Sequence, residues 1–244
     1  MIDIHSHLDI CEDYEAMIER AKKFKILTCG VDVNSNRKAL EIADKFDNVF
    51  ACLGIYPTDA LKISDDDIAR ELKFIRKNKE KIIAIGEVGM DLKESGIGTL
   101  TRQKETLKKF VLLAKDLNKP VIIHSRKAEK ETIELLEEIE YDKILMHCFS
   151  GKIKLVKKII ENGWFLSIPT SVKNTLHFQE IIKLAPIEQL FCETDSPFLH
   201  PDKGFPNEPA NVIESYKVIA EIKGLNLKEV EKQIENNFKN IFQK

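Results

Sequence analysis

Several side chains that commonly bind metal stand at the ends of short apolar runs in this sequence. His5 and His7 close the first run, and Glu87 follows a run that ends at Gly86. The complete set comprises His5, His7, Glu87, Asp91, His124, His147 and Asp195. If the runs are parallel strands of one barrel, their carboxyl ends meet at a single rim, which is where barrel enzymes carry their active sites.

Imidazoles and carboxylates grouped in this way are typical of a divalent-metal site. Because residues i and i+2 of a strand point to the same face, His5 and His7 can bind one ion together. Taken singly, each residue is interpreted equally well as a hydrogen-bonded structural side chain. Taken jointly, such a set without a cation would crowd buried polar groups at a high free-energy cost. The expected metal ligands are His5, His7, Glu87, His124, His147 and Asp195.

The number of candidate ligands favours two ions over one. Four imidazoles and two or three carboxylates exceed the four ligands of a tetrahedral ion. Glu87 can bridge two ions, and metal pairs about 3.5–4 Å apart stabilise the attacking and leaving oxygens of a hydrolysis. Imidazole favours Zn²⁺, Mn²⁺ or Fe²⁺, whereas carboxylate favours Mg²⁺ or Mn²⁺. The predicted cofactors are therefore two divalent metal ions (Zn, Mg or Mn) in a hydrolase.

The elements that must position these residues alternate regularly along the chain. Continuous apolar runs, as expected of strands covered on both faces, occupy residues 1–5, 25–33, 49–53, 82–85, 121–123, 144–146, 164–168 and 190–192. Helical spacing of apolar residues predicts helices over 36–46, 64–79, 103–117, 127–139, 154–162, 178–185, 212–223 and 227–238. This alternation predicts an α/β fold, a single (β/α)8 TIM barrel with an extra C-terminal helix.

A doubly wound open sheet is the structural alternative to the barrel. It would have fewer strands and a glycine-rich phosphate loop after the first strand, whereas here the first run ends in His5-Ser6-His7. The 244 residues contain no long linker, so we expect one domain spanning residues 1–244. Residues 91–101 and 200–209 contain glycines and prolines and are predicted to form loops over the rim.

Composition limits the possible functions. The formal net charge is −2, so the chain carries no overall basic field of the kind that coats nucleic acid. No apolar run approaches the ~20 residues of a membrane span, and the N-terminus has no signal-peptide pattern. We therefore expect a cytoplasmic protein. The five cysteines show no C-x-x-C spacing, which indicates reduced, buried side chains.

Seven sequence motifs, taken in their order along the chain, resemble those of a known protein family. They are DIHSHLD at 3–9, GIYP at 54–57, GEVGMD at 86–91, PVIIHSR at 120–126, HCFSG at 147–151, ETDSPF at 193–198 and NEPAN at 207–211. Together they resemble the TatD-type metal-dependent deoxyribonucleases, a branch of the amidohydrolase-like barrels. The resemblance covers nearly the whole chain and implies hydrolysis of DNA phosphodiesters, often by trimming single strands from a 3′ end. DNA would then be the partner, with no membrane and no obligate protein partner.

The resemblance also implies a role for each candidate residue. Its ligand sets are His5, His7 and Asp195 for one ion, and His124 and His147 for the other, with Glu87 as the bridge. Asp195 would also orient or deprotonate the attacking water, which makes Asp195 and Glu87 the implied catalytic residues. Ser125, Arg126 and Asn207 would contact substrate phosphate or sugar. Glu193 would hold neighbouring ligands in place.

This chain departs from the family pattern at two places near the rim. Tyr56 stands where the family usually has histidine, and Phe205-Pro206 replace two basic residues. Fewer basic groups weaken the grip on a polyanion, while Phe205 could stack on a base or pack on the protein. The alternative function is a metal-dependent hydrolase of a small lactone, amide or phosphoester. Relatives of that type often carry a lysine where this chain has Glu87, which favours the nuclease.

Overall fold

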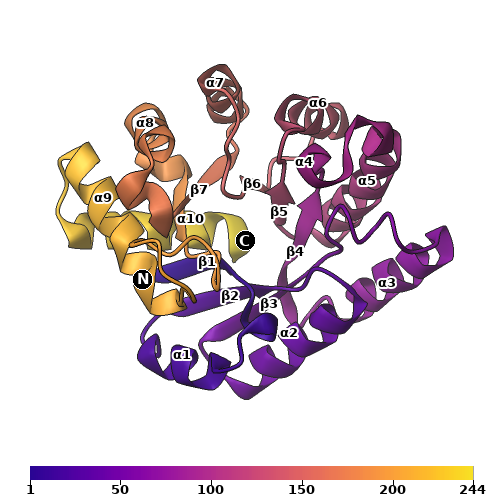
Figure 1. Ribbon diagram of the computed structural model, residues 1–244, viewed down its shortest axis with the longest axis horizontal. Helices are drawn as coiled ribbons and strands as arrows, with labels where there is room; N and C mark the ends of the chain where they lie inside the picture. The colour runs from indigo at the N-terminus through magenta and orange to yellow at the C-terminus, as the bar shows by residue number, and fades with distance from the viewer. Residues whose placement is uncertain (244) are drawn as a thin grey trace.

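Eight parallel strands in the order β1 to β8 form the centre of the structure, a computed structural model that describes residues 1–243 (Figure 1). The strands are β1 (Ile2–Ser6), β2 (Lys25–Cys29), β3 (Val49–Leu53), β4 (Ile82–Gly89), β5 (Val121–His124), β6 (Ile144–Met146), β7 (Phe165–Pro169) and β8 (Leu190–Glu193). Each strand pairs in parallel with the next one along the chain. The predicted barrel is therefore confirmed.

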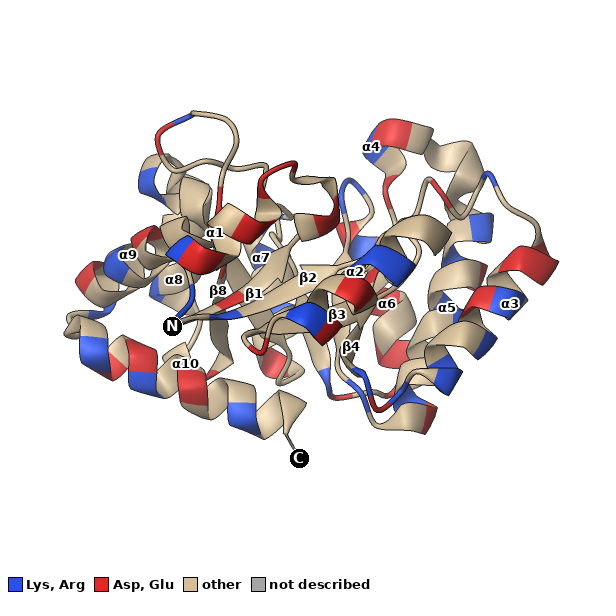
Figure 2. Ribbon diagram, turned by 90° about the horizontal axis from the view of Figure 1, so that it is seen from below, with Lys and Arg blue, Asp and Glu red and all other residues tan. Residues whose placement is uncertain are grey.

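Most helices surround this sheet in chain order, whereas α4 (Leu92–Ser95) and α10 (Leu227–Phe242) lie at its two ends (Figure 1 and Figure 2). The others are α1 (Tyr14–Arg20), α2 (Val33–Lys45), α3 (Asp65–Lys77), α5 (Leu100–Leu117), α6 (Glu129–Ile139), α7 (Ile153–Glu161), α8 (Leu176–Leu184) and α9 (Ile213–Lys223). Short 3-10 turns are η1 (Leu8–Ile10), η2 (Ile97–Thr99), η3 (Thr170–Asn174), η4 (Ile187–Gln189) and η5 (Pro209–Val212).

The sequence-based predictions differ from the structure at several places. The strand predicted over residues 25–33 ends at Cys29, and α2 already begins at Val33. Helix α1 was not predicted, because its seven residues bury only Met17 and Ile18 and so show little periodicity. The predicted loop at residues 91–101 contains α4 and η2, since the Asp91 carboxylate accepts a hydrogen bond from Glu94 N (2.9 Å) and caps a helical turn. Strand β4 continues past residue 85 to Gly89, so Glu87 lies within the strand.

Helix α10 confirms the predicted extra helix and lies at the opposite end of the barrel from α4 (Figure 2). Asn237 Nδ2 donates hydrogen bonds to the carbonyls of Ile187 (2.8 Å) and Leu190 (2.9 Å), where β8 begins. The fully buried Phe238 ring lies 6.5 Å from that of Phe50 at the start of β3. The helix therefore covers the amino ends of the strands and leaves the carboxyl rim open for a site.

The barrel closes where β1 meets the segment after β8, a contact that we call the seam. Asp195 N donates to His5 O (2.9 Å), and His7 N donates to Ser196 O (2.7 Å). Ser6 and Ser196 form an isolated parallel bridge here. The seam therefore sets two histidines of the first strand beside an aspartate almost 190 positions later in the chain.

Two expectations from composition can be compared with the structure. Within residues 1–243, none of the helices is long and apolar enough to cross a membrane. All five cysteines are free, as predicted; Cys148 is half-buried and the other four are buried.

The buried Asp3 carboxylate accepts hydrogen bonds from Thr194 N (2.8 Å) and Thr194 Oγ1 (2.6 Å) across the seam. We predict that Asp3→Ala lowers the free energy of unfolding by about 1–3 kcal/mol, because it leaves the buried Thr194 N–H without its partner. Urea unfolding followed by circular dichroism measures the change. The matched change at the exposed Asp47, Asp47→Ala, should stay within about 0.5 kcal/mol of the parent. Equal unfolding midpoints for the two variants would contradict the prediction.

Candidate metal centre

The carboxyl ends of five strands bring six predicted ligands to one place. The residues, with their strands, are His5 and His7 at the end of β1, Glu87 in β4, His124 in β5, His147 after β6 and Asp195 after β8. All of them are buried except His124 and Asp195, which are partly buried. The convergence predicted from the sequence is therefore present in the tertiary structure.

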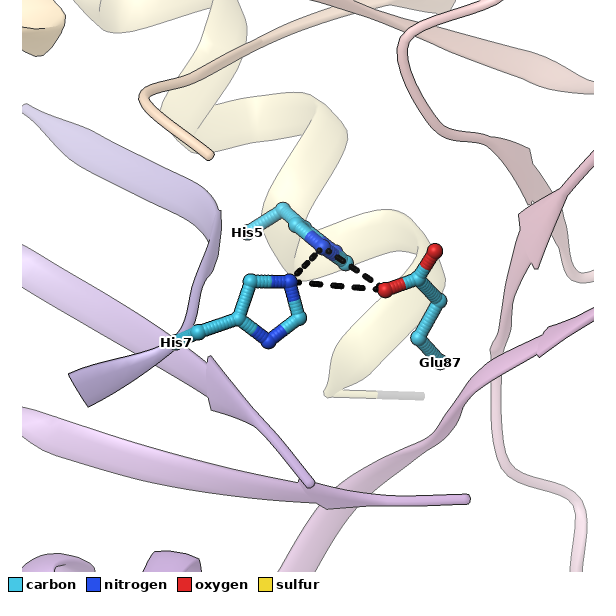
Figure 3. A group of neighbouring side chains, drawn as sticks. All are labelled: His5, His7 and Glu87. Carbon is cyan, nitrogen blue, oxygen red and sulfur yellow. Dashed lines mark hydrogen bonds and ion pairs between the residues drawn. The ribbon is translucent and has the colours of Figure 1, made fainter. Parts of the chain in front are cut away.

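Four ligand atoms lie close together on the seam side. His5 Nε2 and His7 Nε2 are 3.2 Å apart, and each lies 3.4 Å from Glu87 Oε2 (Figure 3). Asp195 Oδ1 lies 3.5 Å from His5 Nε2 and 3.4 Å from His7 Nε2. Ligands held at about 2.0–2.2 Å from a tetrahedral ion are separated by roughly 3.3–3.6 Å. Each of the two carboxylate oxygens therefore fits a divalent cation together with the two imidazoles.

The other oxygen of Glu87 faces a second pair of imidazoles. Glu87 Oε1 lies 2.8 Å from His124 Nδ1 and 3.6 Å from His147 Nε2. Because its two oxygens face different histidine pairs, Glu87 stands between two candidate ion sites. A close approach of β4 to β5 contributes to this geometry, since a Cβ on Gly89 would lie 1.9 Å from His124 O.

In three of the imidazoles, the ring nitrogen that faces away from the cluster lies within hydrogen-bond distance of an oxygen acceptor. His7 Nδ1 lies 3.0 Å from Cys29 O, and His147 Nδ1 lies 2.9 Å from Glu193 Oε2. His124 Nε2 lies 2.9 Å from Asp91 Oδ2. Carbonyl and carboxylate oxygens only accept hydrogen bonds, so these nitrogens carry the protons. The opposite nitrogen of each ring can then offer its lone pair to a metal, as metal-binding histidines commonly do.

Electrostatics also indicate that the cluster requires positive charge. Burial lowers the pKa of His7, but the Asp195 and Glu87 carboxylates raise it to about 9. Burial opposes protonation of His147 as well, yet Glu193 raises its pKa to about 10. Burial raises the pKa of Glu87, but His124, His147 and His5 hold it well below its usual value. Since buried carboxylates need compensating charge, protons on imidazoles or metal cations must supply it.

The cluster forms the floor of a cavity of about 600 Å³ on the carboxyl rim. Ser125 and Arg126 both line this cavity, as the sequence predicts for substrate contacts. Arg126 is half-exposed, and its Nη1 lies 3.7 Å from Glu94 Oε1. Tyr56 also lines the cavity, and its hydroxyl donates to Asp91 Oδ2 (3.0 Å).

Asn207, which the resemblance implies as a substrate contact, is not among the residues that line the cavity. It is fully buried, and its Nδ2 donates to Thr170 Oγ1 (3.0 Å) and Thr194 O (2.8 Å). Its Oδ1 accepts from Glu208 N (2.9 Å) and from Asn211 Nδ2 (2.9 Å). Since both polar ends of the side chain are already bonded, Asn207 holds the loop after β8 in place.

Two further residues around the site were not predicted from the sequence. Ser167 Oγ donates to Glu193 Oε2 (2.5 Å) and thereby helps orient the partner of His147. A serine inside a continuous apolar strand was a usable signal, because a buried hydroxyl needs a partner. Phe198 lines the cavity and is 47% exposed, whereas Phe205, which we considered for base stacking, is 74% exposed and lies outside the cavity lining. Phe198 belongs to the ETDSPF motif at 193–198 and follows Asp195 by three positions, which was a usable signal.

Comparison with known proteins defines the class of this fold and site. The chain is 25% identical to YjjV of Escherichia coli, a TatD homolog, whose crystal structure superposes with a TM-score of 0.92 over 100% of this chain and 98% of that one. A curated relative from Methanocaldococcus jannaschii, an uncharacterized metal-dependent hydrolase, is 36% identical over 97% of this chain and 94% of its own length. Barrel, site and relatives together define a metal-dependent hydrolase.

The family follows from the sequence match. The model of the TatD related DNase family matches residues 2–243, and the chain belongs to this family. The human deoxyribonuclease TATDN3 is 34% identical over 100% of this chain and 95% of its own length. The resemblance noted from the seven motifs is thereby confirmed.

Proposed function

We propose that this enzyme hydrolyses phosphodiester bonds of DNA, trimming single strands from a 3′ end, and that residues 1–244 act as one catalytic domain. The position of Glu87, whose two oxygens face different imidazoles of one histidine cluster, is the observation that carries the proposal. Relatives named as deoxyribonucleases support DNA as the substrate. The glutamate at this position, rather than a lysine, favours the nuclease over a small-molecule hydrolase.

The ligands can be assigned to two ions around Glu87. His5, His7 and Asp195 would hold one divalent ion, and His124 and His147 would hold the other, with Glu87 shared between them. When bound, a pair of such ions polarises a phosphodiester and acidifies water. The mixture of imidazole and carboxylate ligands suits Zn²⁺, Mn²⁺ or Mg²⁺.

Asp195 is suited to accept a proton from an attacking water. Its side chain is 16% exposed, whereas that of Glu87 is 3% exposed, so Asp195 is the more accessible of the two carboxylates. Burial raises the pKa of Asp195, but His7, His147 and His5 outweigh this effect and lower the pKa, which keeps the carboxylate ionised. An ionised carboxylate within hydrogen-bond reach of water is a competent general base.

Ser125 and Arg126 are suited to hold the substrate beside this carboxylate. Both follow β5 directly and line the cavity next to His124. The Arg126 guanidinium can donate two parallel hydrogen bonds to a phosphate, which would fix its orientation. The Ser125 hydroxyl can donate to a phosphate or sugar oxygen.

Replacing the shared carboxylate tests the proposed mechanism. We predict that Glu87→Gln lowers the rate of single-strand cleavage at least about a hundredfold, the scale on which a preorganised electrostatic contact contributes to catalysis. A 5′-labelled oligonucleotide incubated in Mg²⁺, Mn²⁺ or Zn²⁺ and resolved by length shows both the rate and the end attacked. The same change at the exposed Glu105, Glu105→Gln, is the control and should cleave like the parent. A full ladder from Glu87→Gln would rule out the mechanism.

Salt dependence tests how the strand is held. In the described part of the chain, Arg126 is the only lysine or arginine among the residues lining the cavity. On single strands each phosphate contact contributes about −0.7 to the slope of log affinity against log salt, so kcat/KM should fall only about threefold between about 50 and 200 mM salt. Arg126→Ala should flatten this dependence, whereas the exposed Lys130→Ala should not. A parent slope several times steeper would show that further basic groups contact DNA.

A further inference from the structure

The cavity lacks the basic lining that a protein normally uses to grip a polyanion. Around the candidate metal ligands it presents one guanidinium, Arg126, against the carboxylates of Asp9, Asp59 and Glu94. Fixed charges of this balance attract a phosphate chain weakly beyond the reacting phosphate itself. If DNA is the substrate, much of its binding free energy must therefore come from another part of the nucleotide.

Part of the cavity lining is apolar and exposed to solvent. Ile10 and Phe198, 54% and 47% exposed, belong to it together with Val31 and Leu199. Ile10 lies in η1 just after β1 and Phe198 lies just after β8, so the seam brings both beside the metal ligands. Large apolar side chains left exposed at a cavity mouth indicate a surface that a ligand covers.

Phe198 is held in place next to the reacting centre. Its backbone N–H donates to Asp195 O (2.8 Å), which ties it to a candidate metal ligand. Its ring centroid lies 6.4 Å from that of His7, with an angle of 65° between the two ring planes. A nucleotide with its phosphate at the metal ligands would therefore place a neighbouring base within reach of this ring.

We infer that Phe198, with Ile10 in the same cavity lining, is a base-stacking platform that recognises a nucleobase flanking the scissile phosphate. This inference rests on the proposed nuclease function and names the part of DNA that the site binds. Stacking on an aromatic ring is available to every base, so the platform favours unstacked ends without selecting a sequence. It also compensates for the weak electrostatic grip of the cavity.

Abasic substrates separate recognition of the base from recognition of the backbone. The test compares three oligonucleotides. The first lacks the base at the terminal 3′ position, the second lacks the base at the penultimate 3′ position, and the third has all its bases. We expect the parent enzyme to cleave at least one abasic strand with a kcat/KM about tenfold lower, the scale of one base–aromatic stack. Phe198→Ala should remove this difference by slowing the strand with all its bases, and Phe198→Trp should restore it.

Phe205→Ala is the matched control, because Phe205 is the more exposed phenylalanine and lies outside the cavity lining. It should discriminate against the abasic strands as the parent does. The inference is overturned if the parent cleaves all three strands equally, if Phe198→Ala keeps the discrimination, or if it slows all strands by the same factor. If the parent cleaves no strand in Mg²⁺, Mn²⁺ or Zn²⁺, the nuclease proposal fails first and the platform fails with it.

Discussion

The contact between the two ends of the barrel is the constraint on which the site depends. Asp195 N bonds to His5 O, and His7 N bonds to Ser196 O, so backbone hydrogen bonds fix the position of Asp195 against the first strand. Loop closure over so long a chain segment costs conformational entropy, which the buried core of the barrel must offset. The same contact places Phe198 beside His7, so the proposed catalytic residues and the proposed base-stacking platform share one structural origin.

Burying this cluster of charged and polar side chains without a cation costs free energy, and this cost indicates that the cluster binds cations. Glu87 and four imidazoles lie together with little access to water, and each protonation state leaves some charge without a solvent shell. The cost is reduced from outside by Cys29 O, Asp91 and Glu193, which fix three of the rings. A cluster organised so that its lone pairs converge is arranged for cations rather than for fold stability alone.

Much of the fold could be predicted because it follows from local pattern. The eight apolar runs and the amphipathic helices between them indicated a barrel, and the ligand residues at the strand ends indicated a common rim. Helix α1 could not be predicted, because only two of its residues are buried and apolar, too few to show helical periodicity in the sequence. The helical turns between Asp91 and Thr99 were missed because glycines obscured a side-chain cap at Asp91.

The sequence by itself determined the chemistry of the site, since residue types at strand ends restrict which groups can meet at the rim. Only the tertiary structure decided which of these groups are free to act. Asn207 and Arg126 are similar candidates in the sequence, yet Asn207 is bonded at both ends in the core and Arg126 lines the cavity. Likewise Phe198, rather than Phe205, borders the metal ligands. Exposure and hydrogen-bond partners depend on packing between distant segments, which no local sequence pattern records.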